Sequence, residues 1–297
     1  MSATLAERFV LGTAQFGLAY GVTNQNGKVT PSEAKAIIQH CQQNGITHYD
    51  TAIMYGDAEV SLAQALTDCQ ALDSAQIITK IHRHTTTCEG VIQDVEQSKK
   101  NLGINSFYGL LCHDSALLLG SEGKAVWDYL QKLRTTGQLK KIGVSVYSPS
   151  ELEMVLSHYP IDLVQIPYNV FHQEFATSGM LQKLRDQKVE IHARSIFLQG
   201  TLLARPDDLP TYFRAHLDSY QRFQTILLES KLSALAYCLG HALENPLIDK
   251  VVVGVSSERE LKQILEAMKQ PTNGLQASAK ELNVVDQALI NPSRWKL

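Results

Sequence analysis

The amino-acid sequence predicts an α/β fold of the (β/α)8 TIM-barrel type. Eight short apolar runs read as buried strands, at residues 9–11, 47–49, 77–79, 109–112, 142–144, 163–166, 189–193 and 251–253. Segments with helical periodicity separate them, and strands that alternate with helices form parallel sheets because parallel neighbours need a crossover. An open doubly wound sheet is the alternative, but the G-x-G-x-x-G turn it usually carries for a dinucleotide is missing.

The first helix has the clearest boundaries in the chain. Thr30 is a suitable N-cap, Pro31 fits the first turn, and Glu33 stands where a capping box requires an acidic residue. Apolar residues then recur at helical spacing along one face: Ala34, Ile37, Ile38 and Cys41. Gly45 can adopt the left-handed conformation that ends many helices, so we expect this helix to end there.

The same start signal occurs twice more. Ser148-Pro149-Ser150-Glu151 repeats it in full, and Ser257-Glu258-Arg259-Glu260 repeats it without the proline. After the second signal, an apolar stripe follows at helical spacing: Leu261, Ile264, Leu265 and Met268. Each signal is expected to begin a helix that covers the barrel.

Two segments interrupt the regular alternation. The connection after the seventh strand, from Gln199 to about Arg222, is expected to be a long loop over one face of the barrel. The tail from Pro271 predicts a short closing helix, with apolar residues Leu282, Val285 and Leu289. No linker or low-complexity tract divides the chain, so we expect one domain over residues 1–297.

Composition excludes several classes of function. The net charge is −3 and no run of Lys and Arg occurs, so no nucleic-acid partner is expected. No stretch approaches about 18 apolar residues, and the N-terminus lacks a signal-peptide pattern, so neither a membrane span nor secretion is expected. Five cysteines without C-x-x-C spacing argue against a disulfide framework and a zinc site, and favour a cytoplasmic setting. The oligomeric state cannot be read from the sequence.

Reactive side chains follow three successive strands. Asp50 comes after the second strand, Lys80 after the third and His113 after the fourth, while Tyr55 lies five residues beyond Asp50. The steps of 30 and 33 residues (80 − 50 and 113 − 80) each match about one strand–helix unit. Because barrel active sites lie at the C-terminal ends of the strands, these four side chains are expected at one mouth.

This set of side chains suits the reduction of a carbonyl group. A phenol has a pKa near 10, and a neighbouring ammonium lowers that pKa by favouring the phenolate. A carboxylate beside the lysine keeps it charged and in place. Tyr55 can then protonate a carbonyl oxygen, and His113 can donate a second hydrogen bond to it. No side chain is a hydride donor, so a nicotinamide or flavin cofactor is implied.

The segments after the seventh and eighth strands can bind the cofactor's phosphates. Barrels often use these two loops and a helix N-terminus for that purpose. Here they are residues 194–200 and 254–257, and they offer small side chains, hydroxyls and backbone N–H groups. The alternative is that Ser257 is only an N-cap and Gly200 only a turn.

The same residues also allow structural interpretations and rival functions. Asp50 and Lys80 can form a structural ion pair, and Tyr55 and His113 can be ordinary packed residues. The segment His82-Arg83-His84 can touch substrate or a metal, although a solvated rim is the preferred interpretation. Rival functions are a lyase that forms a Schiff base on Lys80, and a non-catalytic nicotinamide-binding sensor or regulatory protein.

Nearly the whole chain resembles the aldo-keto reductase family. Asp50-Thr51-Ala52-x-x-Tyr55-Gly56 is similar to the family's D-T-A-x-x-Y-G motif, and residues 78–80 and 111–113 resemble its lysine and histidine strands. The resemblance implies that Tyr55 is the acid/base, that Lys80 modulates its pKa and that Asp50 holds Lys80. It also implies that His113 orients the carbonyl group of a small-molecule substrate, in a single barrel without a metal.

The same resemblance implies a cofactor site. Residues 143–145 are similar to the family's G-V-S-N segment, and Gln165 with Tyr168-Asn169 to its Q-x-x-Y-N segment, both of which bind the nicotinamide amide. The family binds NADP(H) more often than NAD(H), so NADP(H) is the expected cofactor. The residues expected to bind it are Ser145, Gln165, Arg194, Ser195, Leu198, Gly200, Gly254, Ser256, Ser257 and Arg259.

Three residues depart from the family pattern. Val146 stands in place of asparagine, Arg194 in place of the aromatic residue that stacks on nicotinamide, and Glu260 near a usual Arg or Gln contact at the adenosine end. Arg259 is the one obvious cation for a ribose 2′-phosphate in that turn. Residues 12–21 and 194–200 resemble a bacterial branch linked to surface-polysaccharide and sugar metabolism, which suggests a sugar-derived substrate.

Overall fold

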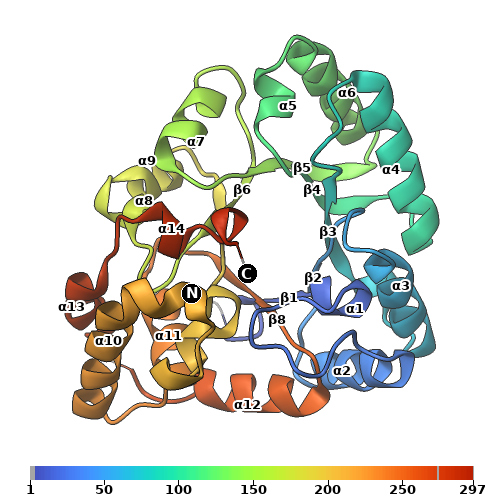
Figure 1. Ribbon diagram of the computed structural model, residues 1–297. Helices are drawn as coiled ribbons and strands as arrows, with labels where there is room; N and C mark the ends of the chain where they lie inside the picture. The colour runs from blue at the N-terminus through green and yellow to red at the C-terminus, as the bar shows by residue number, and fades with distance from the viewer. Residues whose placement is uncertain (1–3, 273, 297) are drawn as a thin grey trace.

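Eight parallel strands pair in sequence order into a closed barrel (Figure 1). The computed structural model describes residues 4–272 and 274–296, so the expected domain range of 1–297 extends beyond it at residues 1–3, 273 and 297. The strands are β1 (Phe9–Gly12), β2 (His48–Asp50), β3 (Gln76–Ile81), β4 (Phe107–Cys112), β5 (Leu139–Ser145), β6 (Leu163–Pro167), β7 (Glu190–Arg194) and β8 (Lys250–Gly254). The expected (β/α)8 barrel and all eight of its strands are confirmed.

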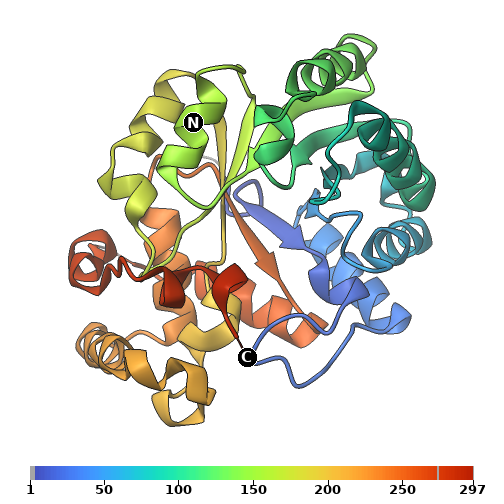
Figure 2. The same cartoon turned by 45° about the horizontal axis from the view of Figure 1, so that its top comes forward.

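Helices surround the barrel on its outside (Figures 1 and 2). Those that cover the strands are α2 (Pro31–Gln43), α3 (Ala58–Asp68), α4 (Cys88–Leu102), α6 (Gly123–Thr135), α7 (Pro149–Leu156), α9 (Met180–Asp186), α11 (Ala234–Glu244) and α12 (Glu258–Met268). The additional helices are α1 (Ala14–Gly17), α5 (Ala116–Leu119), α8 (Glu174–Thr177), α10 (Leu217–Ser230), α13 (Leu275–Ser278) and α14 (Gln287–Ile290).

The predicted helix starts have the expected caps. The side chains of Thr30, Ser148 and Ser257 each accept a hydrogen bond from the backbone N–H three residues later, at the start of α2, α7 and α12. The carboxylate of Glu33 does not close a capping box within α2. It accepts from the backbone N–H of Glu258 at 2.5 Å and so ties the start of α12 to α2.

The alternation of side chains along the strands determines which residues point into the barrel at its C-terminal end. Val10, Ile78, Leu111 and Leu163 form a buried cluster contributed by four different strands, inside the barrel. Side chains two residues apart on a strand share a face. The residues two positions further along therefore face inward at the C-terminal mouth: Gly12, Lys80, His113 and Gln165.

Two segments differ in detail from the expectation. The long connection after β7 does exist, but α10 begins at Leu217, inside the range expected to be loop, because Tyr220, Phe223 and Leu227 bury one face. Before α10 the chain forms short 3-10 turns. The C-terminal tail forms the short helices α13 and α14, with Leu282 and Leu289 buried but Val285 84% exposed.

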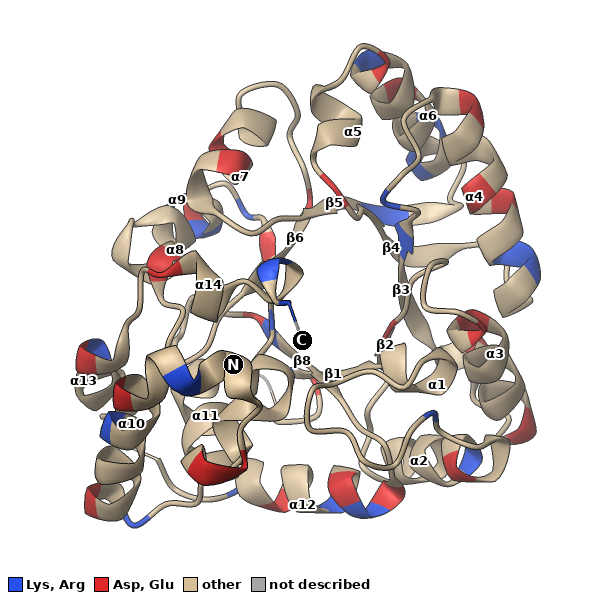
Figure 3. Ribbon diagram, in the orientation of Figure 1, with Lys and Arg blue, Asp and Glu red and all other residues tan. Residues whose placement is uncertain are grey.

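Charged residues of both signs are spread over the outer helices, including α4, α6 and α12 (Figure 3). In the described ranges, no helix is both long and apolar enough for a membrane crossing. Nor does any group of three or more His, Cys, Asp or Glu within residues 4–272 and 274–296 form a candidate metal site.

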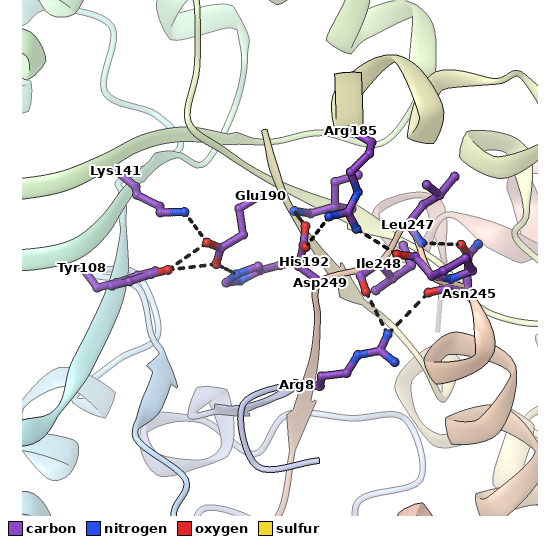
Figure 4. Close-up of polar contacts among 12 residues, drawn as sticks. Arg8, Tyr108, Lys141, Arg185, Glu190, His192, Asn245, Leu247, Ile248 and Asp249 are labelled. Atoms are coloured by element: carbon purple, nitrogen blue, oxygen red, sulfur yellow. Dashed lines mark hydrogen bonds and ion pairs between the residues drawn. The ribbon is translucent and has the colours of Figure 1, made fainter. Parts of the chain in front are cut away.

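A polar network closes the N-terminal end of the barrel (Figure 4). Glu190 at the start of β7 accepts hydrogen bonds from Tyr108 at 2.8 Å and from His192 at 2.6 Å, and it pairs with Lys141. Burial alone would raise the pKa of Glu190, but the hydrogen bonds and charges of His192 and Lys141 outweigh it and hold the pKa well below its usual range. Arg8 adds hydrogen bonds to backbone carbonyls at this end.

Replacing Glu190 by glutamine is expected to destabilise the fold by about 2 kcal/mol, because the partly buried cation of Lys141 loses its counter-charge. The measurement is urea unfolding at pH 7. Glu153→Gln is the matched control, since its pair with Lys183 is about half exposed and contributes less than about 1 kcal/mol. Equal effects of the two substitutions would show that the network at the barrel end is not stabilising.

Candidate active site

A buried lysine and carboxylate lie at the C-terminal mouth of the barrel. The Lys80 ammonium donates to Asp50 Oδ1 at 2.6 Å and to the Thr51 carbonyl at 2.8 Å. Gln165 donates to the other Asp50 oxygen at 2.8 Å. Lys80 is 1% exposed and Asp50 4%. Burial lowers the pKa of Lys80, and the adjacent Asp50 carboxylate opposes that shift.

Tyr55 lies directly over this pair. The Lys80 Nζ is 4.9 Å from the centroid of the Tyr55 ring, and no hydrogen bond joins the ammonium to the phenol hydroxyl. Burial, with a smaller contribution from Asp50, raises the pKa of Tyr55 above its usual value, while Arg194 opposes the rise. The expected lowering of the Tyr55 pKa is therefore absent, because burial dominates here. The phenol is protonated at neutral pH and can donate its proton.

A close backbone approach fixes the Tyr55 loop. A Cβ on Gly17 would lie 1.8 Å from the carbonyl oxygen of Tyr55 and 2.5 Å from the nitrogen of Ala58. Only glycine allows α1 to pack this tightly against the loop. Gly56, next to Tyr55, has a φ of +60°, which also favours glycine. The glycines at positions 17 and 56 thus hold the phenol at the mouth.

His113 faces Tyr55 edge-on across the mouth. The two ring centroids are 5.9 Å apart with an interplanar angle of 85°. Burial, followed by the positive charges of Lys80, Arg83 and Arg194, lowers the pKa of His113 to about 2. The imidazole is therefore neutral at physiological pH, with one N–H to donate and one nitrogen to accept. Its buried Nδ1 has no partner in the described part of the chain.

A cavity of about 960 Å³ opens above these residues. Tyr55 and His113 line one part of it, and the loop after β1 and the segments after β7 and β8 line much of the rest. Ten of the predicted site residues line this cavity: Asp50, Tyr55, His113, Ser145, Gln165, Arg194, Ser195, Gly200, Gly254 and Ser256. Its size is in the range of pockets that hold large organic ligands.

Four predicted residues do not line the cavity. Lys80 is fully buried, and its ammonium is bonded to Asp50. The side chain of Leu198 is also fully buried, and Ser257 serves as the N-cap of α12. Arg259 is exposed outside the cavity. The cation expected near a ribose 2′-phosphate is therefore absent from the lining.

The loop after β7 has an unusual backbone. Ser195, Leu198 and Gln199 have positive φ angles of 59°, 47° and 54°, and Gly200 has a φ of 92°. Each non-glycine residue in this conformation costs about 1–2 kcal/mol, and such strain is typically kept at functional sites. Asn169 steadies the loop by donating to the Ser195 carbonyl at 2.9 Å. The strained loop lines the cavity, which fits a large ligand that contacts the backbone.

The end of the cavity near β8 is uncharged or acidic. Glu260 accepts hydrogen bonds from the backbone N–H and the hydroxyl of Ser256, both at 2.7 Å. Asn26, from the loop after β1, also donates to the Ser256 hydroxyl at 2.9 Å. The other lining residues at this end are neutral: Gly254, Gln263 and Ile264. Glu260 thus occupies the donors of Ser256 that an anion would otherwise use.

Several lining residues were not identified from the sequence. The sequence favours a solvated rim for Arg83, yet its half-buried side chain lines the cavity. Tyr20, Asn26 and Ser293 line it as well. They come from the loop after β1 and from the C-terminal tail, which no local pattern connects with the mouth. The sequence contains one signal for Arg83: it lies two residues after the end of β3, the strand that carries Lys80.

Arg194 at the end of β7 is held in place by its neighbours. Its guanidinium carbon is 4.3 Å from the centroid of the Tyr147 ring, a cation–π arrangement. It also donates to the Val146 carbonyl at 3.2 Å and to the Ser195 hydroxyl at 3.3 Å. Val146 itself is fully buried and offers only its backbone to this region.

Comparison with known proteins relates the chain to one family of oxidoreductases. A sequence model described as the Aldo/keto reductase family matches residues 8–285. The chain is 25% identical over 275 residues to a 6-dehydroglucose reductase of Agrobacterium fabrum, which covers 85% of this chain and 88% of the relative. It is 25% identical to a D-threo-aldose 1-dehydrogenase of a Pseudomonas species, over 96% of this chain and 99% of the relative.

The chain is also similar to a plant reductase and to a solved bacterial structure. A D-galacturonate reductase of Fragaria ananassa is 27% identical over 55% of this chain and 56% of its own length. Among solved structures, an aldo-keto reductase of Bacillus halodurans in its holo form has a TM-score of 0.75. It shares 16% sequence identity and covers 97% of this chain and 95% of its own, a likeness that shows the fold.

Proposed function

Given that the chain belongs to the aldo/keto reductase family, and is therefore an oxidoreductase of carbonyl compounds, we propose that its reaction occurs where Tyr55, Lys80 and His113 meet. The product is an alcohol, and a bound nicotinamide dinucleotide supplies the hydride that reaches the carbonyl carbon. The observation that carries this proposal is the buried Lys80–Asp50 pair directly beneath the Tyr55 ring.

In this proposal Tyr55 delivers the proton to the carbonyl oxygen. Its raised pKa keeps it protonated until negative charge builds on that oxygen. As the proton leaves, the phenol oxygen becomes negative, and the nearby Lys80 ammonium stabilises that charge. Asp50 acts through Lys80, because its carboxylate fixes the ammonium. Neutral His113 donates a hydrogen bond to the carbonyl oxygen and orients it.

The cofactor is proposed to lie along the cavity from Tyr55 to the start of α12. Ser145, Gln165 and Arg194 would contact its nicotinamide end, a proposal supported by their lining the same cavity as Asp50. The strained loop of Ser195, Leu198 and Gly200 is assigned to the pyrophosphate, because its positive φ angles are typical of backbone turns whose N–H groups bind anions. The turn before α12 is assigned to the adenosine end, with Gly254 and Ser256 as candidate contacts from the cavity lining. Ser257 and Arg259 lie next to them outside the lining, and their contact with the cofactor stays a prediction.

The rival functions make different demands. A Schiff base on Lys80 requires a free amine, whereas this ammonium is buried and donates two hydrogen bonds. A regulatory barrel would bind cofactor without turnover.

We propose a sugar-derived carbonyl compound as substrate, supported by relatives whose names specify sugar substrates. The deciding assay follows the loss of NADH or NADPH absorbance with a panel of sugar-derived aldehydes and ketones. Tight cofactor binding with no turnover of any of them would favour the regulatory function.

The cofactor preference is a separate prediction. The resemblance predicts NADP(H). In the described ranges, however, the end of the cavity near α12 is lined by the acidic Glu260 and by no cation. We therefore expect NADH to bind at least as tightly as NADPH. Glu260→Gln removes a negative charge and should tighten NADPH binding about tenfold, with NADH changed less than about threefold.

This prediction is checked by fluorescence titration of the protein with each reduced cofactor. Glu266→Gln is the matched control, because it removes the same charge at an exposed position further along α12. If wild-type protein binds NADPH more than about tenfold tighter than NADH, cations outside the lining must recognise the 2′-phosphate. Arg259 would then be the residue to substitute first.

A further inference from the structure

Two guanidinium groups lie at the catalytic end of the cavity. Arg83 follows β3 and Arg194 ends β7, and both side chains line the cavity. Within the described residues, neither guanidinium forms an ion pair with a carboxylate. The ion pairs found there involve other cations, such as Lys80, Arg134 and Arg185. Among the described lining residues, the carboxylate at this end is Asp50, which is already bonded to Lys80 and Gln165. Asp94 accepts hydrogen bonds from the His82 N–H and the Thr85 hydroxyl beside Arg83, but it is not within ion-pair distance of the Arg83 guanidinium. Two guanidinium groups without a carboxylate partner in the described residues therefore border the space above Tyr55.

The position of Arg83 follows from the order of the strands. Tyr55 follows β2, Arg83 follows β3 and His113 follows β4, and these three strands are neighbours in the barrel. Adjacent strands are about 4.8 Å apart, so Arg83 is delivered between the two groups that would contact the carbonyl oxygen. Its charge contributes to the low pKa of His113, after burial and Lys80, which places it within electrostatic range.

Arg194 stands on the opposite wall, because β7 is four strands away from β3 in a barrel of eight. The Tyr147 ring, the Val146 carbonyl and the Ser195 hydroxyl fix its orientation. A guanidinium held in this way loses little freedom when it binds an anion. Its charge adds to that of Arg83 at the mouth.

We propose that the substrate carries an anionic group, a carboxylate or a phosphate, close to its carbonyl carbon, and that Arg83 binds that group. This inference rests on the proposed reductase function and specifies its substrate class. A guanidinium forms paired hydrogen bonds to either anion. The chain has a net charge of −3, so attraction for an anion must come from these local cations. One relative is named for an acid sugar, D-galacturonate.

The test compares matched anionic and neutral aldehydes in the full chain. For the carboxylate arm, succinic semialdehyde is compared with its methyl ester; for the phosphate arm, glyceraldehyde 3-phosphate is compared with glyceraldehyde. Both kcat/KM and Kd, the latter from calorimetry, are measured. In at least one arm the anionic partner is expected to be preferred about tenfold or more, the strength of one charge-assisted hydrogen bond. The arm with the larger preference identifies the anion.

Variants assign the preference to Arg83. Arg83→Gln is expected to reduce the ratio of kcat/KM for the anionic over the neutral partner to within about threefold of unity, whatever its effect on the neutral partner alone; Arg83→Lys keeps part of that ratio. Arg134→Gln is the control for net charge, since Arg134 pairs with Asp162 at a distant, half-exposed position. No anionic preference in wild-type protein, or one that Arg83→Gln leaves intact, overturns the inference. Arg83-dependent anion binding without turnover would instead uphold it and reject the reductase function.

Discussion

Tyr55→Phe is expected to abolish carbonyl reduction while leaving cofactor binding unchanged. The substitution removes one oxygen atom, so the ring still packs over Lys80 and edge-on to His113. What disappears is the proton that must reach the carbonyl oxygen as the hydride arrives. General acid catalysis of this kind contributes about 10²–10⁴-fold, and we expect the loss in kcat to lie in the upper half of that range.

The measurements are steady-state turnover with a proven substrate and fluorescence titration of the reduced cofactor. Tyr129→Phe is the matched control, because Tyr129 lies in α6 and does not line the cavity. Its turnover should equal that of the wild-type protein. Full turnover by the Tyr55 variant would mean that another group, or water, donates the proton, and the role proposed for Tyr55 would be wrong.

The barrel could be predicted from sequence because each of its strands is a short apolar run between helix signals. Strands that are buried on both faces need no alternation of apolar and polar side chains, so runs such as residues 163–166 are recognisable by their apolar composition alone. Thr30 and Ser257 mark helix starts through local hydrogen bonds, which a sequence pattern captures directly. Asp50, Lys80 and His113 could then be grouped because parallel strands deliver their C-terminal ends to one mouth.

The remaining features depend on contacts between distant segments. Asn26 and Ser256 are 230 residues apart in the chain, and only the fold brings them together. The pattern predicts loop as far as about Arg222, where α10 has already begun, because the apolar residues Tyr220, Phe223 and Leu227 follow a proline-containing stretch that is typical of a loop. The direction of the Tyr55 pKa shift could not be inferred either, since it depends on how deeply the phenol is buried.

Lys80→Met is expected to reduce both turnover and stability, and the two losses have different causes. Turnover should fall about 10²-fold or more, because the negative charge that develops on the Tyr55 oxygen loses its neighbouring cation. The fold should lose about 3–5 kcal/mol, because the Asp50 carboxylate stays buried with a donor from Gln165 as its main remaining support. Exposed Lys124, paired with Asp128 on α6, provides the control: Lys124→Met should leave the urea unfolding transition close to that of the wild-type protein.

A double variant separates the two causes. Adding Asp50→Asn to Lys80→Met removes the orphaned charge, so unfolding in urea should show that most of the lost stability returns. Turnover should remain low, because the amide restores no cation beneath the phenol. If the double variant regains turnover together with stability, Lys80 and Asp50 are a structural ion pair at the barrel mouth. If turnover stays low while stability returns, the ammonium has a chemical role, and its closeness to the Tyr55 ring is the physical basis of that role.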